Sequence, residues 1–422
     1  MRKIRKFATS LGMKLDKCRH CGAELQDPVV DLGMSPLCES YVPADRLDTM
    51  EPFYPLHVSV CSKCLLVQLN EYVTADHIFT EYAYFSSFST AWLKHAEDYV
   101  EMISHRLELG PKSFVVELAS NDGYLLQYFV KKQIPCLGIE PAANVAEAAR
   151  AKGVETQVTF FGRESATELR NRRGAADLII GNNVLAQVPD VNSFVAGAAI
   201  ALAPTGTVTF EFPHLMTLFE QNQFDTIYHE HFSYFSLLSA EHIFAAHGLT
   251  VFDVEELWTH GGSLRVYLRP SADVSRPVSD RVLALRAREE AAGYREMATY
   301  RRFEEQVRAT KRKLLSLLID AKNSGKKVVG YGAPGKGNTL LNYCGIREDF
   351  LEFTVDRNPY KQGKFLPGTH IPIHAPERLD EARPDYILIL PWNFKDEIIK
   401  QLAHTRDWGA KFIVPIPEAT VV

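Results

Sequence analysis

The segment QFDTIYHEHFSYFS, residues 223–236, gathers side chains that can accept or donate a proton. Tyr228, His229, Glu230 and His231 follow one another within it. A histidine, with an unperturbed pKa of ~6.5, suits general-base catalysis at neutral pH, and a neighbouring carboxylate can orient the ring. The segment therefore predicts acid–base chemistry. Two alternatives stay open: a turn that only satisfies core hydrogen bonds, and a divalent-metal site of the two histidines and Glu230.

Four of the seven cysteines form two pairs, Cys18-x2-Cys21 and Cys61-x2-Cys64, with 39 residues between the pairs. Two such pairs can present four thiolates in a tetrahedron, which is a common ligand set for zinc. Because the protein then fills all four positions, no position is left for water, and we expect a structural zinc ion. A thiol redox pair is the alternative.

The stretch FVVELASNDGYLL, residues 114–126, reads as a strand, a turn of small residues and a helix. Small residues let the backbone approach a ligand, and free amides at a helix N-terminus can bind it. Glu140 ends the next apolar run, 23 positions after Glu117, an offset at which a carboxylate can bind both ribose hydroxyls. Ala119 and Asn121 stand where a GxGxxG turn has glycines. An ordinary strand–turn–helix with a chance acid is the alternative.

A second turn of this kind lies in VVGYGAPGKGNTLL, residues 328–341, which contains the spacing Gly330-x-Gly332-x-x-Gly335. Asp356 follows the next apolar run, so the pattern on its own matches the dinucleotide fingerprint and indicates NAD. A docking domain without ligand is the alternative.

The regions around these motifs predict the elements that position them. From about residue 113, short apolar runs alternate with amphipathic stretches, which indicates βαβ units and a mostly parallel sheet. A charged stretch with apolar residues at helical spacing predicts one or two long helices, and a second α/β series follows. The predicted plan is a small metal-binding module (1–75), a doubly wound domain (76–272), a helical linker (273–325) and a second Rossmann-like domain (326–422).

Composition limits the classes of partner. The chain has 422 residues, 46% hydrophobic and 23% charged, which predicts a globular protein of two or three domains. A net charge of −5 argues against broad binding to nucleic acid or anionic membranes, and no apolar run approaches the ~20 residues that cross a bilayer. The basic N-terminus lacks the apolar core of a secretory signal, so we expect a cytoplasmic protein. We also expect a monomer. In a reducing cytosol the remaining cysteines should be small buried apolar residues: Cys38, Cys136 and Cys344.

The stretches VVELASNDGYLL, GIEP and DLIIGNNVLAQVPD together resemble the binding core of class I S-adenosylmethionine-dependent methyltransferases. In that family the first turn holds the methionine part of the donor, the acid after the second strand holds the ribose, and the segment after the fourth strand lines the adenine and the methyl group. The resemblance therefore implies a donor site with these residues: Glu117, Ala119, Asn121, Gly123, Glu140, Asn182 and Asn183.

Five features also occur together in one order: the CxxC…CxxC module, EYAYFSSFS (81–89), YHEHFSYFS (228–236), HGGSLRVYL (260–268) and GYGAPGKGNTLL (330–341). This arrangement, over about residues 15–420, resembles the sugar C-methyltransferases of deoxysugar biosynthesis, including that of antibiotics. The resemblance implies S-adenosyl-L-methionine and structural Zn²⁺ as cofactors. It also implies a dTDP-linked 4-keto-deoxysugar as substrate, methylated on the carbon next to the ketone, C-3.

The resemblance extends to single residues. His231 is the expected base that forms an enolate, Tyr82 its expected companion at the enolate oxygen, and Tyr228, Glu230 and Asn183 are further candidates. The C-terminal domain would bind the nucleotide-sugar rather than NAD, because a methylation needs no hydride transfer. Its expected binding residues are Gly335, Lys336, Asp356, Arg357 and Asn358. An O- or N-methyltransferase on a nucleotide-sugar and a non-catalytic ligand-binding protein are the alternatives.

Overall fold

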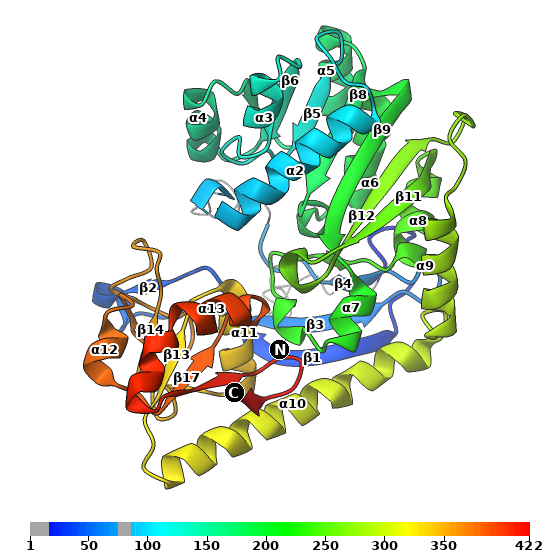
Figure 1. The fold of residues 1–422 in the computed structure, drawn as a ribbon. Coiled ribbons are helices and arrows are strands. Elements are labelled where there is room, and N and C mark those ends of the chain that lie inside the picture. Colours follow the sequence, from blue (N-terminus) through cyan, green and yellow to red (C-terminus); the bar gives the residue numbers. More distant parts are fainter. Residues whose placement is uncertain (1–16, 75–85, 89) are drawn as a thin grey trace, which may run out of the picture.

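The structure is a computed structural model that describes residues 17–74, 86–88 and 90–422 (Figure 1). Its N-terminal part forms an antiparallel sheet in the order β1-β3-β4-β10. The strands are β1 (Asp27–Ser35), β3 (Tyr54–Val60), β4 (Val67–Leu69) and β10 (Ser233–Tyr234). The last strand directly follows the YHEH motif in sequence, so this motif is joined to the cysteine-containing part of the chain.

The middle of the chain forms a seven-stranded sheet in the order β11-β12-β9-β8-β5-β6-β7. Five neighbouring strands are parallel, and β12 is antiparallel to both β9 and β11. The strands are β5 (Val115–Leu118), β6 (Cys136–Glu140), β7 (Thr156–Val158), β8 (Ala176–Asn182), β9 (Leu202–Pro213), β11 (Leu249–Leu257) and β12 (Ser263–Pro270). Strand order reverses at β5, so a crevice is expected at the carboxyl ends of β5 and β8.

Helices cover both faces of this sheet (Figure 1). They are α2 (Thr90–Arg106), α3 (Leu126–Lys131), α4 (Ala143–Ala151), α5 (Arg163–Arg173), α6 (Val191–Ala201) and α8 (Leu237–Ala246). Helix α7 (Leu215–Glu220) instead packs into the hydrophobic cluster of β3 and α10 (Met297–Asn323). The parallel strands β5 and β8 are buried almost throughout, which explains their continuous apolar sequences.

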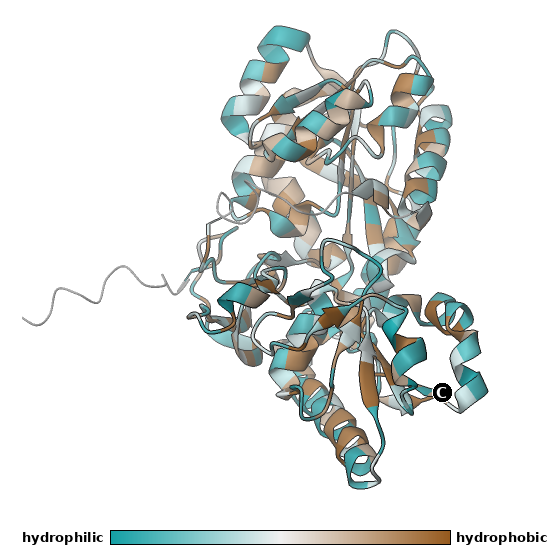
Figure 2. Cartoon of the chain, turned by 90° about the vertical axis from the view of Figure 1, so that its left-hand side faces the viewer, coloured by the Kyte–Doolittle hydropathy of each residue, from teal (hydrophilic) through white to brown (hydrophobic). Residues whose placement is uncertain are grey.

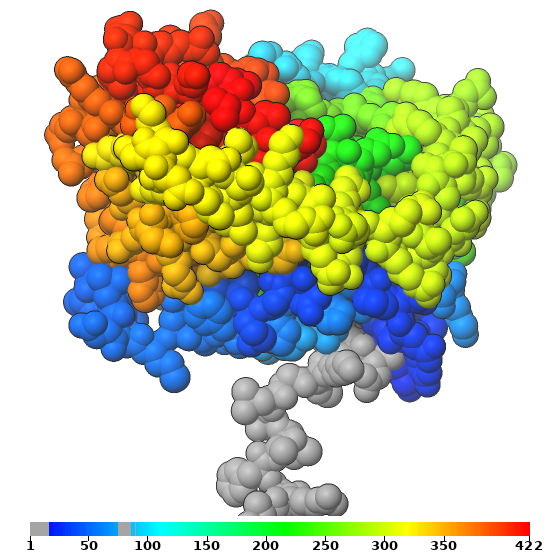
Figure 3. All heavy atoms as spheres, turned by 90° about the horizontal axis from the view of Figure 1, so that it is seen from below, coloured from blue at the N-terminus to red at the C-terminus, as the bar shows by residue number. Residues whose placement is uncertain are grey.

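The charged stretch after β12 forms two helices, α9 (Asp280–Ala291) and α10 (Met297–Asn323). Ser279 accepts a hydrogen bond from the amide of Val282 and thereby caps α9. One face of α10 is buried at helical spacing, with Phe303, Val307 and Leu314 among its residues. In Figure 3 this helix, drawn in yellow, lies across the molecule against both the blue N-terminal sheet and the orange and red C-terminal part.

The C-terminal part forms a six-stranded sheet in the order β16-β14-β13-β17-β18-β19, parallel except for β19. Its strands are β13 (Val328–Tyr331), β14 (Thr354–Val355), β16 (Ile373–His374), β17 (Tyr386–Ile389), β18 (Lys411–Val414) and β19 (Thr420–Val421). Its helices are α11 (Gly335–Cys344), α12 (Arg378–Ala382) and α13 (Lys395–Gln401). The interior strands are hydrophobic and the outer helical surfaces largely hydrophilic (Figure 2). The predicted α/β fold is confirmed.

The N-terminal and C-terminal parts share one hydrophobic core. Val58 of β3, Leu318 of α10 and Val329 of β13 belong to the same buried cluster. A two-stranded pairing of β2 (Val42–Pro43) with β15 (Lys364–Phe365) adds a backbone connection between these parts. Among the helices of the described ranges, no helix is long and apolar enough to cross a membrane.

His229 anchors the YHEH motif to the N-terminal sheet. Its Nε2 atom lies 3.2 Å from the carbonyl oxygen of Pro55, and its ring makes edge contacts with Tyr54 and Tyr72. Burial lowers the pKa of His229 to about 4. The folded chain therefore keeps this imidazole neutral at pH values where the unfolded chain, with a pKa of ~6.5, takes up a proton.

We predict that acid destabilises the protein through this residue. Between pH ~6.5 and about 4 the unfolded state binds the additional proton, so His229 should lower the free energy of unfolding by ~1.4 kcal/mol for each pH unit of decrease. Urea unfolding at pH 7.5 and 5.5 should show a smaller loss for His229→Gln than for the wild type. Equal pH dependence in the two proteins would contradict the prediction.

Candidate active site

A cavity of about 320 Å³ lies where the seven-stranded sheet, the YHEH motif and the start of α11 meet. Several predicted residues line it: Ala119, Asn121, Glu140, Asn182, Asn183, Tyr228, Glu230, Gly335 and Lys336. The structure thus brings together predicted donor, catalytic and substrate residues that are up to 217 positions apart in the sequence. The other described candidates are not on the wall: Glu117, Gly123, His231, Asp356, Arg357 and Asn358. Tyr82 lies outside the described residues.

The turn after β5 has an unusual backbone. Ala119, Asn121 and Gly123 all adopt left-handed conformations, with φ of 53°, 50° and 74°. The carboxylate of Glu140 accepts hydrogen bonds from the amides of Asn121 and Ala142, each 2.9 Å long. Glu140 therefore shapes this turn while it also faces the cavity. A Cβ atom on Gly123 would come within 2.9 Å of Val154, so close packing is a sufficient reason for this glycine.

Several buried polar atoms lie next to the turn. The side chains of Glu117 and Asn182 both interact with the hydroxyl group of the buried Tyr124, whereas the Oδ1 atom of Asn183 is buried without a hydrogen bond from any described residue. Burial raises the pKa of both Glu117 and Glu140 above the usual range. Buried polar groups are normally paired, so this set suits a ligand that brings its own hydroxyl, amine and carboxylate groups. The residues present therefore fit S-adenosylmethionine.

His229, Glu230 and His231 of the YHEH motif contact different parts of the chain. A hydrogen bond from the amide of His231 to the carbonyl of Tyr228 (2.9 Å) closes a turn. Glu230 then lies 3.7 Å from the Sγ atom of Cys38, and His229 lies against the N-terminal sheet. The divalent-metal interpretation finds no support, because within the described ranges only the four paired cysteines form a metal-ligand group.

The His231 ring is prepared to accept a proton. Its Nδ1 atom lies 3.1 Å from the carbonyl oxygen of Thr226, and since a carbonyl only accepts, Nδ1 carries the hydrogen. Nε2 then has a lone pair, and it is buried without a partner among the described residues. The ring of Tyr228, which lines the cavity, packs 4.2 Å from the His231 ring. Thr226, rather than the expected Glu230, therefore orients this histidine.

Burial controls the charge of both groups. Burial lowers the pKa of His231 to about 3, so the imidazole is neutral at physiological pH. Burial and the negative charge of Glu39 raise the pKa of Glu230 to about 8. Glu230 is therefore largely protonated at neutral pH, and it can donate a hydrogen bond as well as accept one.

The start of α11 differs from a dinucleotide site. Asp356 accepts hydrogen bonds from the amides of Ala333 and Asn358, each 2.7 Å long, and it therefore orders its own loop. A Cβ atom on Gly335 would lie 3.1 Å from a carboxylate oxygen of Glu39. Glu39 therefore lies close to the helix end at which either a dinucleotide or a nucleotide-sugar would place its pyrophosphate.

Lys336 extends into the cavity from the first turn of α11. Its Nζ atom donates to Asn393 (3.0 Å) and lies 4.6 Å from the ring centre of Trp392. Asp225, which is fully buried, accepts a hydrogen bond of 2.7 Å from Trp392 and adds a favourable charge near Lys336. Burial lowers the pKa of Lys336 in spite of this carboxylate.

Among the cavity residues that were not predicted as site residues are Cys38, Glu39, Trp92 and His260. Cys38 is buried as predicted, but it faces Glu230 instead of a purely apolar core. Cys344 is buried in the C-terminal core and Cys136 is only half-buried. His260 belongs to the HGGSLRVYL motif, whose two glycines were the signal of a special backbone conformation.

The four paired cysteines form a separate site. Their Sγ atoms all lie within 4.8 Å of one another, and the distances Cys18–Cys64 and Cys21–Cys61 are both 3.5 Å. Thiolates at ~2.3 Å from zinc in a tetrahedron are about 3.8 Å apart, so the arrangement fits the ion. The Nε2 atom of Gln68 donates to Cys18 Sγ (3.3 Å), an outer contact that stabilises a thiolate.

Comparisons with known proteins agree with this arrangement. Family models match in order a zinc binding domain (residues 18–79), a methyltransferase domain (92–254) and a C-methyltransferase C-terminal domain (258–417). The chain is 38% identical to C-methyltransferase NovU of Streptomyces niveus over 411 residues, which cover 97% of each protein. The chain belongs to the C-methyltransferase family.

More distant similarities cover less than half of the chain. A ubiquinone biosynthesis O-methyltransferase of Rhodopseudomonas palustris is 24% identical over 92 residues, 22% of this chain and 36% of that protein. A solved S-adenosylmethionine-dependent methyltransferase of Mesorhizobium loti covers 42% of this chain and 99% of its own, with 15% identity and a TM-score of 0.34. The assignment does not rest on these two.

This member of the C-methyltransferase family uses S-adenosyl-L-methionine and has a zinc-binding N-terminal module. The non-catalytic alternative is wrong, since the chain is a methyltransferase.

For the zinc site we predict about one zinc ion per chain, because four thiolates complete the coordination. Cys61→Ser should lose the ion and lower the thermal midpoint. Cys136→Ser is the matched control, since this cysteine is remote from the cluster, and it should keep its zinc. Metal analysis of the three purified proteins tests this; a Cys61→Ser protein with a full complement of zinc would overturn it.

For the donor site we predict that Glu140→Ala weakens S-adenosylmethionine binding by ~1.5–3 kcal/mol, the usual contribution of hydrogen bonds to a charged group. Titration calorimetry measures the affinity. Glu155→Ala, which removes an exposed carboxylate paired with Arg173, is the control and should bind the donor normally. Unchanged affinity in Glu140→Ala would remove Glu140 from the donor site.

Proposed function

We propose that the enzyme methylates a carbon of a dTDP-linked 4-keto-deoxysugar, next to the ketone and at C-3, in the biosynthesis of an antibiotic deoxysugar. The observation that carries the proposal is the single cavity shared by the β5 turn, Tyr228 beside His231, and Lys336. A donor and an activated sugar bound from opposite sides would meet there. The name C-methyltransferase of the relative supports transfer to carbon.

The chemistry needs a base, because a C–H next to a ketone becomes a nucleophile only when its proton is removed. His231 suits this role, since it is neutral and its Nε2 lone pair has no partner among the described residues. Tyr228 packs against this ring and faces the cavity, and Glu230 can hydrogen-bond a sugar hydroxyl. S-adenosylmethionine, when bound, supplies the electrophilic methyl group. We keep Tyr82 as a candidate partner of the enolate oxygen.

The C-terminal domain is our candidate for binding the nucleotide-sugar. Gly335 and Lys336 line the cavity at the start of α11, and Lys336 carries a positive charge suited to an anionic substrate. Arg357 and Asn358 lie near the end of β14, next to the ordering carboxylate of Asp356. Ligands of open α/β sheets bind at such strand ends.

We predict that His231→Asn lowers the turnover number ~10²–10⁴-fold, the usual contribution of a general base, and leaves donor affinity nearly unchanged. His229→Asn is the matched control, because it changes a buried histidine of the same turn that faces away from the cavity. Turnover is measured with a dTDP-linked 4-keto-deoxysugar and labelled donor. A His231→Asn protein with wild-type turnover would falsify the assignment of the base.

The position of the methyl group tests the substrate chemistry separately. NMR of the product should show a new C–CH₃ bond next to the former ketone. In heavy water without donor, wild-type enzyme should exchange the hydrogen on that carbon and His231→Asn should not, because deprotonation does not need the methyl group. A methyl group on oxygen or nitrogen would instead support the O- or N-methyltransferase alternative.

A further inference from the structure

The HGG turn before β12 holds a histidine in a rare conformation. His260 has φ of 54° and ψ of 18°, and Gly261 and Gly262 follow with φ of 91° and 126°. Left-handed backbone at a non-glycine residue is uncommon and costs free energy. Such a conformation persists only where the surrounding structure enforces it, and it is concentrated at functional sites.

Neighbours from separate parts of the chain enforce this turn. The carbonyl of Gly261 accepts a hydrogen bond from Gln223 (2.7 Å), and the carbonyl of Gly262 accepts one from the amide of His214 (3.1 Å). No side chain would fit at either glycine, since a Cβ atom would approach Trp392 to 2.8 Å at Gly261 and Thr217 to 2.5 Å at Gly262. The turn is therefore fixed by α7, by the segment before YHEH and by the C-terminal domain.

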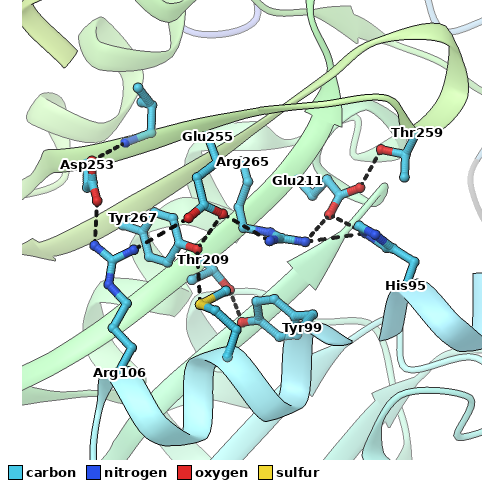
Figure 4. Close-up of polar contacts among 12 residues, drawn as sticks. His95, Tyr99, Arg106, Thr209, Glu211, Asp253, Glu255, Thr259, Arg265 and Tyr267 are labelled. Atoms are coloured by element: carbon cyan, nitrogen blue, oxygen red, sulfur yellow. Dashed lines mark hydrogen bonds and ion pairs between the residues drawn. The ribbon is translucent and has the colours of Figure 1, made fainter. Parts of the chain in front are cut away.

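A buried ion network holds the residue before His260 (Figure 4). Thr259 donates to one carboxylate oxygen of Glu211 (2.7 Å), and His95 (3.1 Å) and Arg265 (2.9 Å) contact the other. Burial alone would raise the pKa of Glu211. The hydrogen bond with His95 and the positive charge of Arg265 outweigh burial and lower this pKa to about 2. Glu211 is also joined to the donor side, because its carbonyl accepts a hydrogen bond from the amide of Asn183 (2.7 Å).

The His260 ring faces the cavity that the β5 turn and the start of α11 share. It forms part of the wall and makes an edge contact with Trp92, with ring centres 5.1 Å apart. Its Nε2 atom has no hydrogen-bond partner in the described part of the chain. Burial, and then the charge of Lys336, lower its pKa to about 4, so the ring is neutral and one nitrogen carries a hydrogen.

The proposed base makes a second polar group necessary. Because His231 has a low pKa, it can remove a carbon-bound proton only if the enolate is strongly stabilised. A neutral N–H held in a buried site can supply this stabilisation at the developing oxyanion. Lys336 lines the same cavity and adds a positive charge there.

We propose that His260 is a further catalytic residue, which donates an imidazole N–H to the ketone oxygen of the substrate and stabilises the enolate there. Glu211 and Thr259 are positioning residues for this turn. The inference rests on the proposed function, because it requires a ketone substrate. It assigns to the HGG motif a role that neither the donor site nor the base explains.

The test removes the ring without disturbing the backbone. His260→Gly tolerates a φ of 54°, and His260→Asn is a second variant suited to left-handed backbone with a side chain too short to replace the imidazole. Both should lower turnover ~10²–10³-fold, as expected for the loss of one oxyanion donor. Donor affinity should stay at the wild-type value, and added imidazole should restore part of the turnover of His260→Gly.

A spectroscopic measurement separates this role from a structural one. In the complex with S-adenosylhomocysteine and a dTDP-linked 4-keto-deoxysugar carrying ¹³C at the keto carbon, the wild-type protein should shift the carbonyl resonance downfield, because a hydrogen bond polarises the carbonyl. The shift should disappear in both His260 variants and persist in His231→Asn. An unchanged shift in the His260 variants overturns the inference. A wild-type enzyme that methylates no carbon of the keto sugar would instead sink the proposed function.

Discussion

The structure depends on one buried, irregular segment, residues 222–236, whose backbone amides and carbonyls must all find hydrogen-bond partners. Residues 222–236 contain only short helical and strand pieces, so their amides and carbonyls must find partners elsewhere. The amide of Phe232 donates to Ala186 of the methyltransferase domain, and its carbonyl accepts from Leu69 of the N-terminal sheet. The segment therefore makes hydrogen bonds with both the N-terminal sheet and the methyltransferase domain. It holds the zinc-binding module against the methyltransferase sheet, and its residues Tyr228 and Glu230 line one side of the cavity.

The cavity that results has several neutral polar groups on its wall or directly behind it. Burial keeps the imidazoles of His231 and His260 uncharged and keeps Glu230 largely protonated at neutral pH. Glu39 and Lys336 bring charged groups to the wall itself, whereas other charges form fixed pairs behind it, such as Glu211 with Arg265. A site of this kind can bind an uncharged ketone without a large desolvation cost and respond strongly when negative charge develops.

Local sequence patterns were sufficient to predict much of the fold. Strands such as β5 and β8 are continuous apolar runs, and the zinc ligands follow from cysteine spacing, because both features are encoded within a few residues. The position of Glu140 at the turn could be predicted for the same reason, because this residue ends a strand that is recognisable in the sequence.

Features that depend on distant contacts could not be read in this way. The orientation of His231 by a carbonyl of its own turn, and the approach of Cys38 and Glu39 to α11, depend on how three sheets meet. His260 was missed because its importance lies in a backbone conformation that remote residues impose. The two consecutive glycines indicate special dihedral angles, but nothing local indicates which cavity the turn faces.

The shared core of the N-terminal and C-terminal parts has a consequence for synthesis on the ribosome. Strand β1 ends at Ser35, whereas α10, which packs against its apolar face, begins at Met297, 262 positions later. At a synthesis rate of ~5–20 residues per second, α10 is made on the order of 10–50 s after β1, and the apolar face of β1 stays without this helix until then. The first strands of the nascent chain are therefore exposed to aggregation during most of translation, and they are a natural target for chaperones that bind extended apolar segments.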